Sequence, residues 1–450
     1  MVGISNIGAE AQKVNSVKAE KDRIEKEAFF CTTKELSRLG LEQIPTQFQS
    51  HKHLIYSSPA TLAFNSPGAE GFGVKRAGLA VPDSIMLIVA PGCCGRNTSL
   101  ISSMKEYNDR FYYLMMDETD IVTGRHLKKI PKAVEEICSV CPKKPSVVMI
   151  CITCVDALLG TDMERVCKKA EEQVEIPVRP CYMYALTREG RKPPMVHVRQ
   201  SLYSLLEPGK KKGNVVNLLG FFSPLVDDCE IYDLLHSAGV KTIHEISRCK
   251  DYMEYQTMSE ANFNLVLHHE ARFAAEDFHN RLQIPFIELR RLYQIDKIEN
   301  QYHALGNALG VAFYDEKYKK QAEDALEKFR QKCPDASFAI GECLNADPFE
   351  LSLALIRYGF SVPEIYGTIT VENFTYIRSL AKISPETKVF SNMEPTMIYY
   401  DPAKSDVNLA IGKDACYYHP DCPYVMWNGE EQPYGYAGVR RLFEQLLEVV

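Results

Sequence analysis

The sequence predicts an α/β protein built from parallel sheets with helices on both faces. Short apolar runs that resemble strands alternate with amphipathic helices from residue 85 onward, and this alternation is typical of parallel sheets. A length of 450 residues is long for one hydrophobic core and indicates two or three domains. Hydrophobic residues make up 46% of the chain, which is enough to build ordinary globular cores.

The predicted elements follow one another as strand and then helix. The predicted strands are 85–90, 146–151, 214–219, 242–246, 263–267, 338–341 and 408–411. The predicted helices are 99–107, 131–137, 158–174, 229–238, 271–282, 348–358 and 438–447.

Two loops divide the chain into candidate domains. Residues 208–213 read Pro-Gly-Lys-Lys-Lys-Gly, a flexible basic linker, and residues 331–335 form a weaker break. Residues 1–55 are polar and predict a mostly helical N-terminal arm. The predicted α/β domains are therefore 56–210, 211–330 and 331–450, the last of which ends in a helix.

Charge and hydropathy exclude several classes of partner. The net charge of -7 provides no electrostatic reason to bind nucleic acid. No segment has the apolar length of a membrane helix, and the charged N-terminus is not a signal peptide, so we expect a cytoplasmic protein without a membrane partner. The chain also lacks the glycine-rich, lysine-containing loop of a P-loop ATP site.

Cysteines cluster at two predicted strand ends. Cys93 and Cys94 follow the strand at 85–90, and Cys151 and Cys154 stand where the strand at 146–151 ends. Carboxyl ends of neighbouring parallel strands converge on one crevice. The pattern favours a shared iron–sulfur or metal site, whereas the isolated cysteines read as small buried hydrophobic residues.

A zinc ribbon is the alternative interpretation of these cysteines. Cys138 with Cys141, and Cys151 with Cys154, have the two-residue spacing of zinc ligands. The context argues against it, because neither pair has a glycine-rich knuckle and both stand at the ends of regular elements. Cys93 and Cys94 could also be buried packing residues.

Motifs along the chain, taken in order, resemble those of nitrogenase component 1 subunits. They are Gly92 with Cys94-Gly95; Asp-Ile-Val-Thr-Gly at 120–124 before a helix at 127–137; Cys154 with Leu-Gly-Thr-Asp-Met-Glu at 159–164; Leu-Leu-Gly-Phe-Phe at 218–222; Asn-Leu-Val-Leu-His at 264–268 followed by Ile-Pro-Phe-Ile-Glu at 284–288; and Pro-Tyr-Gly-Tyr-Ala-Gly at 433–438. They cover most of the chain beyond the arm. The resemblance implies three Rossmann-like domains.

The resemblance also implies a cluster and partners. Cys94 and Cys154 match two of the three cysteines that a nitrogenase subunit supplies to its P-cluster, and the first is missing here. Two thiolates from each of two subunits would hold an interfacial 4Fe-4S or P-cluster-like site, with Cys93 and Cys151 as extra thiols. The expected partners are a second component 1-like subunit, identical or related, and an ATP-dependent iron protein that donates electrons.

The second metal site of the family has changed in this chain. His268 falls where nitrogenase has its cofactor cysteine, and Met426, beside Trp427, falls where it has the cofactor histidine. Dinitrogen reduction by this chain alone is therefore not expected. The predicted crevice is lined by His268, Met426, Trp427 and Tyr434, and would hold a substrate or a second, unknown metal cofactor.

His268 is the candidate catalytic residue. Its imidazole could ligate iron or donate a proton, or it could be a hydrogen-bonded histidine near a strand end. The resulting hypothesis is a reductase subunit that acts on a small organic or tetrapyrrole substrate. The alternatives are a scaffold that assembles a metal cluster without turnover, and a partner subunit that completes a cluster while its sister chain holds the active site.

Overall fold

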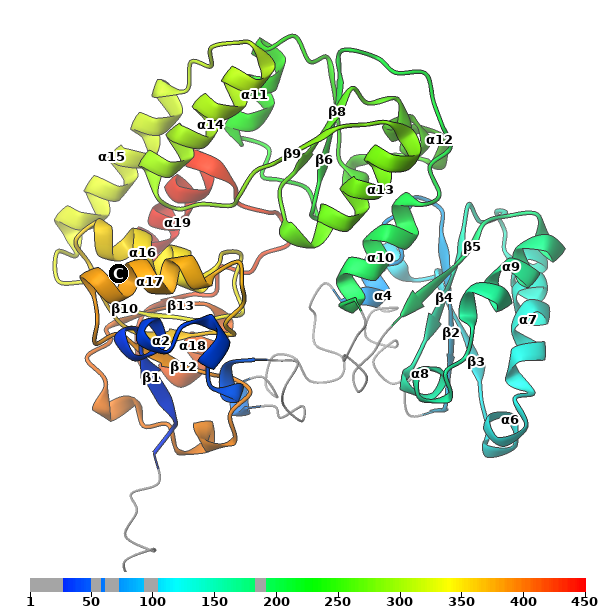
Figure 1. Cartoon of the computed structure of the whole chain (residues 1–450), viewed down its shortest axis with the longest axis horizontal. Helices are drawn as coiled ribbons and strands as arrows, with labels where there is room; N and C mark the ends of the chain where they lie inside the picture. Colours follow the sequence, from blue (N-terminus) through cyan, green and yellow to red (C-terminus); the bar gives the residue numbers. More distant parts are fainter. Residues whose placement is uncertain (1–26, 50–57, 61–72, 93–103, 183–191) are drawn as a thin grey trace, which may run out of the picture.

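The computed structural model describes residues 27–49, 58–60, 73–92, 104–182 and 192–450. Within these residues the chain forms three mostly parallel sheets flanked by helices (Figure 1). The predicted α/β fold class is confirmed. The predicted strands at 85–90, 146–151, 214–219, 242–246, 263–267, 338–341 and 408–411 are all present within one to three residues of the expected bounds.

The first sheet has four parallel strands in the order β3-β2-β4-β5. Its elements are β2 (Ile85–Ala90), β3 (Phe111–Met115), β4 (Val148–Ile152), β5 (Val178–Tyr182), α4 (Val74–Ala77), α6 (Glu118–Thr123), α7 (His126–Val140), α8 (Cys154–Leu159), α9 (Met163–Val174) and α10 (Pro194–Tyr203). Leu87 and Val89 pack in the cluster that contains α7 and α9, whereas Met86 and Ile88 pack in the cluster that contains α10. Helices therefore cover both faces, which explains why β2 is an unbroken apolar run.

The second sheet is also parallel, in the order β7-β6-β8-β9. Its elements are β6 (Val215–Leu219), α11 (Glu230–Ser237), β7 (Thr242–His244), α12 (Tyr252–Gln256), β8 (Phe263–Val266), α13 (Arg272–Leu282) and β9 (Phe286–Glu288). Asn217 and Asn264 lie side by side on β6 and β8, where the Asn217 amide donates to Asn264 Oδ1 over 2.8 Å. The Asn217 amide nitrogen also donates to the Met258 carbonyl oxygen over 2.9 Å, whereas Asn217 Oδ1 and Asn264 Nδ2 have no partner among the described residues.

The third sheet has six strands in the order β1-β12-β11-β10-β13-β14. Its elements are β1 (Phe30–Thr32), α2 (Thr33–Leu39), β10 (Ser337–Ile340), α16 (Pro348–Arg357), β11 (Ser361–Tyr366), α17 (Phe374–Ile383), β12 (Lys388–Phe390), β13 (Leu409–Ile411), α18 (Lys413–Tyr418) and β14 (Tyr424–Val425). All neighbours are parallel except β1, which pairs antiparallel with β12.

Residues 27–49 are the part of the predicted helical arm at 1–55 that the structure describes, and they include a strand as well as a helix. Residues 27–49 form β1, α2 and two short 3-10 turns that pack onto the third sheet, and Leu36 and Phe48 are completely buried there. The hydrophobic surface of these two side chains, together with the pairing of β1 with β12, holds this segment against the sheet. The expected helix at 99–107 also differs: residues 99–103 lie outside the described part, and Lys105–Tyr107 is a 3-10 turn.

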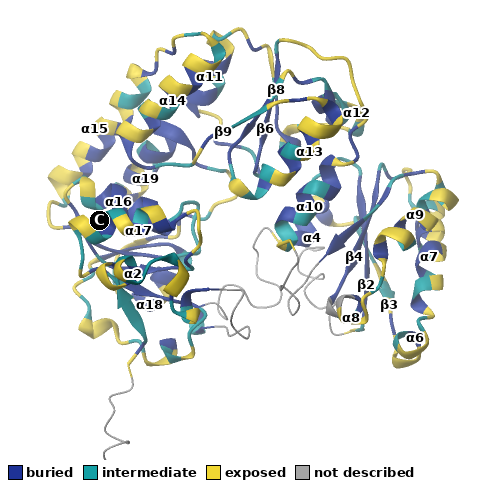
Figure 2. Cartoon of the chain, viewed as in Figure 1, coloured by how far each residue is buried: buried dark blue, intermediate teal, exposed yellow. Residues whose placement is uncertain are grey.

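Three long helices pack together beside the second and third sheets (Figure 1). They are α14 (Ile295–Leu309), α15 (Glu316–Lys332) and the C-terminal α19 (Gly435–Val449). Phe329 of α15 and Phe443 of α19 meet with ring centroids 5.6 Å apart. Buried residues concentrate in the strands and on the inward faces of the helices (Figure 2). Among the described residues, no helix is long and apolar enough to cross a bilayer.

Candidate functional site

Three strand ends meet at a cavity between the second and third sheets. Phe221, His268 and Glu342 each follow the carboxyl end of a strand, β6, β8 and β10 respectively, and all three line a cavity of about 450 Å³. The crevice outside the carboxyl ends of parallel strands is the usual ligand site of such sheets. The cavity is therefore the candidate site.

His268 forms part of the cavity wall, and 33% of its side chain is exposed. Its ring stacks on His269 with centroids 4.5 Å apart and meets the Phe221 ring edge-on at 5.7 Å. Burial, together with the nearby cations Arg199 and Arg291, holds the pKa of His268 well below its usual range. A neutral imidazole suits metal ligation or hydrogen bonding better than it suits donation of a proton from an imidazolium.

Close backbone packing fixes the position of His268. Gly220 has a φ of +143°, and a Cβ at this position would lie 2.8 Å from the His268 backbone nitrogen. Arg199, from α10 of the first unit, donates to the Gly220 carbonyl oxygen over 2.6 and 3.0 Å and to Glu270 over 2.8 Å. One buried guanidinium thus ties the segment around His268 to a helix of another unit.

The other predicted pocket residues do not share this cavity. Met426 and Trp427 line a separate cavity of about 490 Å³. The Trp427 indole nitrogen donates to the Tyr293 hydroxyl over 2.7 Å, and this bond holds the indole inside the protein. Tyr434 is buried and donates to the Arg290 carbonyl oxygen over 3.0 Å. Asn345 lines both cavities and lies between them.

Of the four predicted cluster cysteines, Cys151 is the one whose side chain the structure describes. Cys93 and Cys94 lie outside the described residues, and Cys154 begins α8, immediately beyond β4, with its side chain also outside the description. Cys151 is completely buried in β4, where it pairs in register with Cys181 of β5 and packs in the cluster of α10. Successive strand residues point to opposite faces of a sheet. The Cys151 thiol therefore points into the core on the face that α10 covers.

Polar atoms beside Cys154 have no hydrogen-bond partner. Thr153 Oγ1 and Asp156 Oδ2 are buried and unpaired within the part of the chain that the structure describes. The other Asp156 oxygen bonds the buried His126 Nε2 over 2.9 Å and accepts from Thr161 Oγ1 over 2.9 Å. Unpaired buried polar atoms are unusual in folded proteins and are compatible with a bound group at this strand end.

A zinc ribbon does not fit this arrangement. Cys138 lies in the last turn of α7 and Cys141 directly follows it, on the side where β4 begins. Cys141 contacts the Tyr112 hydroxyl at 3.0 Å. Cys154 stands at the opposite end of β4, so the two pairs cannot share one ion. In the described ranges, no three His, Cys, Asp or Glu side chains come together as a metal site.

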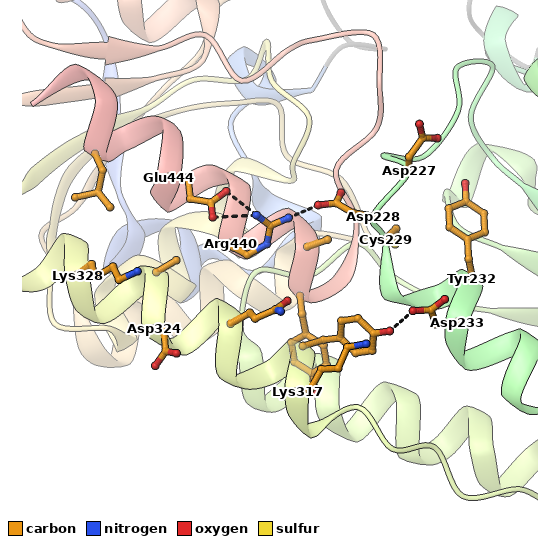
Figure 3. Close-up of a pocket in the computed structure, with 16 residues that line it drawn as sticks. Asp227, Asp228, Cys229, Tyr232, Asp233, Lys317, Asp324, Lys328, Arg440 and Glu444 are labelled. Carbon is orange, nitrogen blue, oxygen red and sulfur yellow. Dashed lines mark hydrogen bonds and ion pairs between the residues drawn. The ribbon is translucent and has the colours of Figure 1, made fainter.

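A larger cavity, of about 670 Å³, lies among α11, α15 and α19 (Figure 3). Arg440 bonds Glu444 over 2.7 Å and also pairs with Asp228, and Tyr318 pairs with Asp233. Arg440 is thus neutralised by Glu444 and Asp228, whereas Asp233 is hydrogen-bonded to the neutral Tyr318 hydroxyl. None of its lining residues directly follows a strand, so this cavity lacks the geometry of the candidate site.

The family assignment agrees with this geometry. A family model described as nitrogenase component 1 type oxidoreductase matches residues 70–450. The chain belongs to this family. The resemblance that the sequence motifs indicated is thereby confirmed.

Relatives of this nitrogenase component 1 type protein include cofactor biosynthesis proteins. The nitrogenase iron-molybdenum cofactor biosynthesis protein NifE of Sinorhizobium fredii is 25% identical over 418 residues, which cover 87% of this chain and 82% of the relative. NifE of Mesorhizobium japonicum is 26% identical with the same coverage. A solved structure titled "Nitrogenase Cp1 at pH 6.5" matches with a TM-score of 0.68 and 18% identity, covers 91% of this chain and 96% of that one, and supports the fold.

Sequence reasoning missed several residues of the site. Arg199, Arg291 and Glu342 line the cavity but belong to none of the motifs used for prediction. A signal was present for Arg291, because Arg290-Arg291 closely follows the Ile-Pro-Phe-Ile-Glu segment that leads into the strand end of β9. No comparable signal marks Arg199, which lies within a helix.

Proposed function

We propose that this chain is a subunit of a nitrogenase-like oxidoreductase. In this proposal it receives low-potential electrons from an ATP-dependent iron protein and reduces a small organic or tetrapyrrole substrate in the cavity beside His268. The observation that carries the proposal is the cavity itself, which lies at the carboxyl ends of β6, β8 and β10 with His268 in its wall.

The electron path requires a cluster near the end of β4. An iron–sulfur cluster held by Cys94 and Cys154, with matching thiolates from a second component 1-like subunit, would supply the redox chemistry. The unpaired buried Thr153 hydroxyl supports a bound group there, since it could donate to a cluster sulfur. Cys93 stays a candidate extra thiol, and the core position of Cys151 favours a packing role for that residue.

Within the cavity, His268 would bind and orient the ligand. Its neutral imidazole can accept a hydrogen bond, donate one through its N–H group, or ligate a metal of a second cofactor. Arg199 and Gly220 would keep the ring in place through the contacts described above. Phe221 and Leu267 provide apolar walls that limit water around the ligand.

A second candidate function is assembly of a metal cofactor without turnover. The observation that favours it is that the relatives named above are cofactor biosynthesis proteins, and that the similarity covers 87% of this chain and 82% of theirs. A third role, in which the chain completes a cluster for a sister subunit that holds the active site, is compatible with the same fold. Fold alone does not distinguish these roles.

Two substitutions separate the electron-entry site from the ligand site. After anaerobic purification with its partner subunit, Cys154→Ser should lose most of the iron and sulfide, because an alcohol is a poor cluster ligand. His268→Ala should keep the iron, since its position lies in another unit, yet lower turnover in the reconstituted system with iron protein and ATP. The loss should be about 10²- to 10⁴-fold if the imidazole is an acid–base group. His303→Ala, on the exposed face of α14, is the matched control for His268.

Three other outcomes would each contradict part of this proposal and support a different alternative. Stoichiometric zinc without iron would contradict the cluster assignment. Unchanged turnover in His268→Ala would place the active site in the partner chain. A wild-type protein that never turns over but transfers its cluster to an apo-enzyme would establish the assembly role.

A further inference from the structure

Arg291 is a partly buried cation that forms no ion pair with any carboxylate among the described residues. Its guanidinium lies over the Phe221 ring, 4.3 Å from the ring centroid, and lines the cavity beside His268. Its Nη2 donates to Gln432 Oε1 over 2.6 Å, whereas its buried Nε has no hydrogen-bond partner among the described residues. Burial lowers the pKa of Arg291, but guanidinium stays charged at neutral pH because its ordinary pKa is above 12.

The acidic groups on the same wall are already paired. Glu270 accepts from Arg199 over 2.8 Å, and Glu288 accepts two bonds of 2.7 Å from Arg272. Arg291 therefore makes no ion pair within the described residues, although its Nε atom is buried. Such a charge is costly to bury unless an anion neutralises it.

We propose that the cavity holds a built site for the carboxylate of an organic ligand, with the Arg291 guanidinium as its main anchor. The inference rests on the proposed function, because it specifies the ligand class of the same cavity. Guanidinium presents planar donors that match a carboxylate, and stacking on Phe221 fixes the plane of those donors. His268 and His269 lie beside this anchor and add N–H groups that can donate to the ligand.

Charge and ligand chemistry favour a carboxylate over other anions. Glu342, Asp347 and Glu372 also line the cavity. Phosphate concentrates up to two negative charges on one centre and would meet more repulsion from them than a carboxylate group, which carries a single charge that one guanidinium can neutralise. Metal–sulfide clusters are held mainly by thiolates, and no cysteine lines the described part of this cavity. An organic carboxylate is therefore the anion that best suits the wall.

The test measures binding to the intact anaerobically purified protein, without iron protein or turnover. Succinate should raise the melting temperature in a saturable manner beyond sodium chloride of equal ionic strength, whereas its neutral diamide should not. Arg291→Met should weaken the succinate affinity by about 10- to 100-fold, as expected for a lost charged hydrogen-bonded pair. Arg272→Met is the matched control, because Arg272 lines the same cavity but is already paired with Glu288.

The stability of the ligand-free variant provides a second readout. Without ligand, Arg291→Met should melt at or above the wild-type temperature, because a buried unpaired charge is removed and the Phe221 contact can be kept by the methionine. A marked fall would make Arg291 a structural cation and overturn the proposal. A wild type that ignores succinate, a variant that retains the response, or tighter binding of inorganic phosphate than of succinate would also overturn it.

The succinate-binding experiment and the turnover experiment with His268→Ala can succeed or fail separately. A succinate response that depends on Arg291, in a protein that shows no turnover, would support the carboxylate site and reject the reductase role. Turnover that depends on His268, without any succinate response, would support the reductase role and reject the carboxylate site.

Discussion

At the scale of single residues, burial raises the pKa of one carboxyl group near the cavity, that of Glu350. Glu350, in the first turn of α16, is completely buried and accepts the backbone N–H of Tyr293 over 2.9 Å. The Gln294 side chain donates to it over 3.0 Å. Burial nevertheless raises the pKa of Glu350 from 4.5 to about 7. The carboxyl anchors the segment that leads from β9 to α14, and its protonation state therefore affects how firmly that segment is held.

The raised pKa of Glu350 predicts a pH-dependent stability. The folded state holds a proton that the unfolded state releases between the two pKa values, so the free energy of unfolding should fall as pH rises from 4.5 to about 7. The full penalty, up to about 3 kcal/mol, applies above that window. Urea unfolding at pH 5 and pH 8 should show a smaller fall in Glu350→Gln than in the wild type.

A matched control isolates this effect from the other buried acids. Glu372 is an exposed glutamate at the same cavity, and Glu372→Gln should keep the wild-type difference between the two pH values. Parallel curves for wild type and Glu350→Gln would show that Glu350 does not titrate in this window.

At the scale of elements, a buried carboxylate caps the C-terminal helix. Glu230, from the first turn of α11, accepts the backbone N–H groups of Tyr436 over 2.6 Å and of Ala437 over 3.0 Å at the start of α19. The Tyr302 hydroxyl donates to the same carboxylate over 2.6 Å. Free N–H groups and a partial positive charge at a helix start favour an anion there. The Pro-Tyr-Gly-Tyr-Ala-Gly motif thus forms the capped start of α19 in this chain.

Gly435 makes room for this cap, and its substitution is predicted to be costly. Gly435 has a φ of +57°, and a Cβ would overlap with Glu230 and the Tyr302 hydroxyl. Gly435→Ala should lower the free energy of unfolding by about 2 to 4 kcal/mol, because it combines backbone strain with displacement of a buried charge. Gly429→Ala is the control, since nothing lies within 4 Å of its Cβ position. Equal urea midpoints for the two variants would contradict the capping role.

At the scale of the whole molecule, a shared hydrophobic cluster joins the first unit to the second. It contains Val198 and Leu202 of α10 together with Ala274 and Phe278 of α13. Arg199 bonds Gly220 and Glu270 of the second unit, as described above. Arg76 of α4 pairs with Glu430, near the C-terminal helix, over 2.6 Å, and its side chain is only 2% exposed. The first unit is thus held to the units that form the cavity, which suits the proposed transfer of electrons between them.

The shortage of matched thiolates predicts an assembly. Because Cys94 and Cys154 provide only two thiolates per chain, another chain would complete a four-thiolate cluster. Light scattering of anaerobic protein should therefore give the mass of a dimer or tetramer, alone or with a sister subunit. The assembled fraction should fall in Cys154→Ser, since a bridging cluster is then lost. A monomer that retains a complete cluster would mean that Cys93 or Cys151 serves as a ligand.

Local patterns in the sequence determined the fold class and much of the framework. Strand β2 has the predicted bounds of 85–90, and β6 and β8 differ from prediction by one residue at a single end, because apolar runs between turn residues are local signals. The same signals placed His268 at a strand end. The ordered motifs also indicated the family that the comparison confirmed.

Only the tertiary structure decided which side chains share a cavity. Met426, Trp427 and Tyr434 stand close in sequence to the motifs, yet the bond from Trp427 to Tyr293 and the burial of Tyr434 separate them from His268. Arg291, beyond β9, instead faces the same cavity as Glu342, beyond β10 of another sheet. Proximity between sheets depends on long-range packing and hydrogen bonds, which no local periodicity encodes; the pairing of β1 with β12 has the same origin.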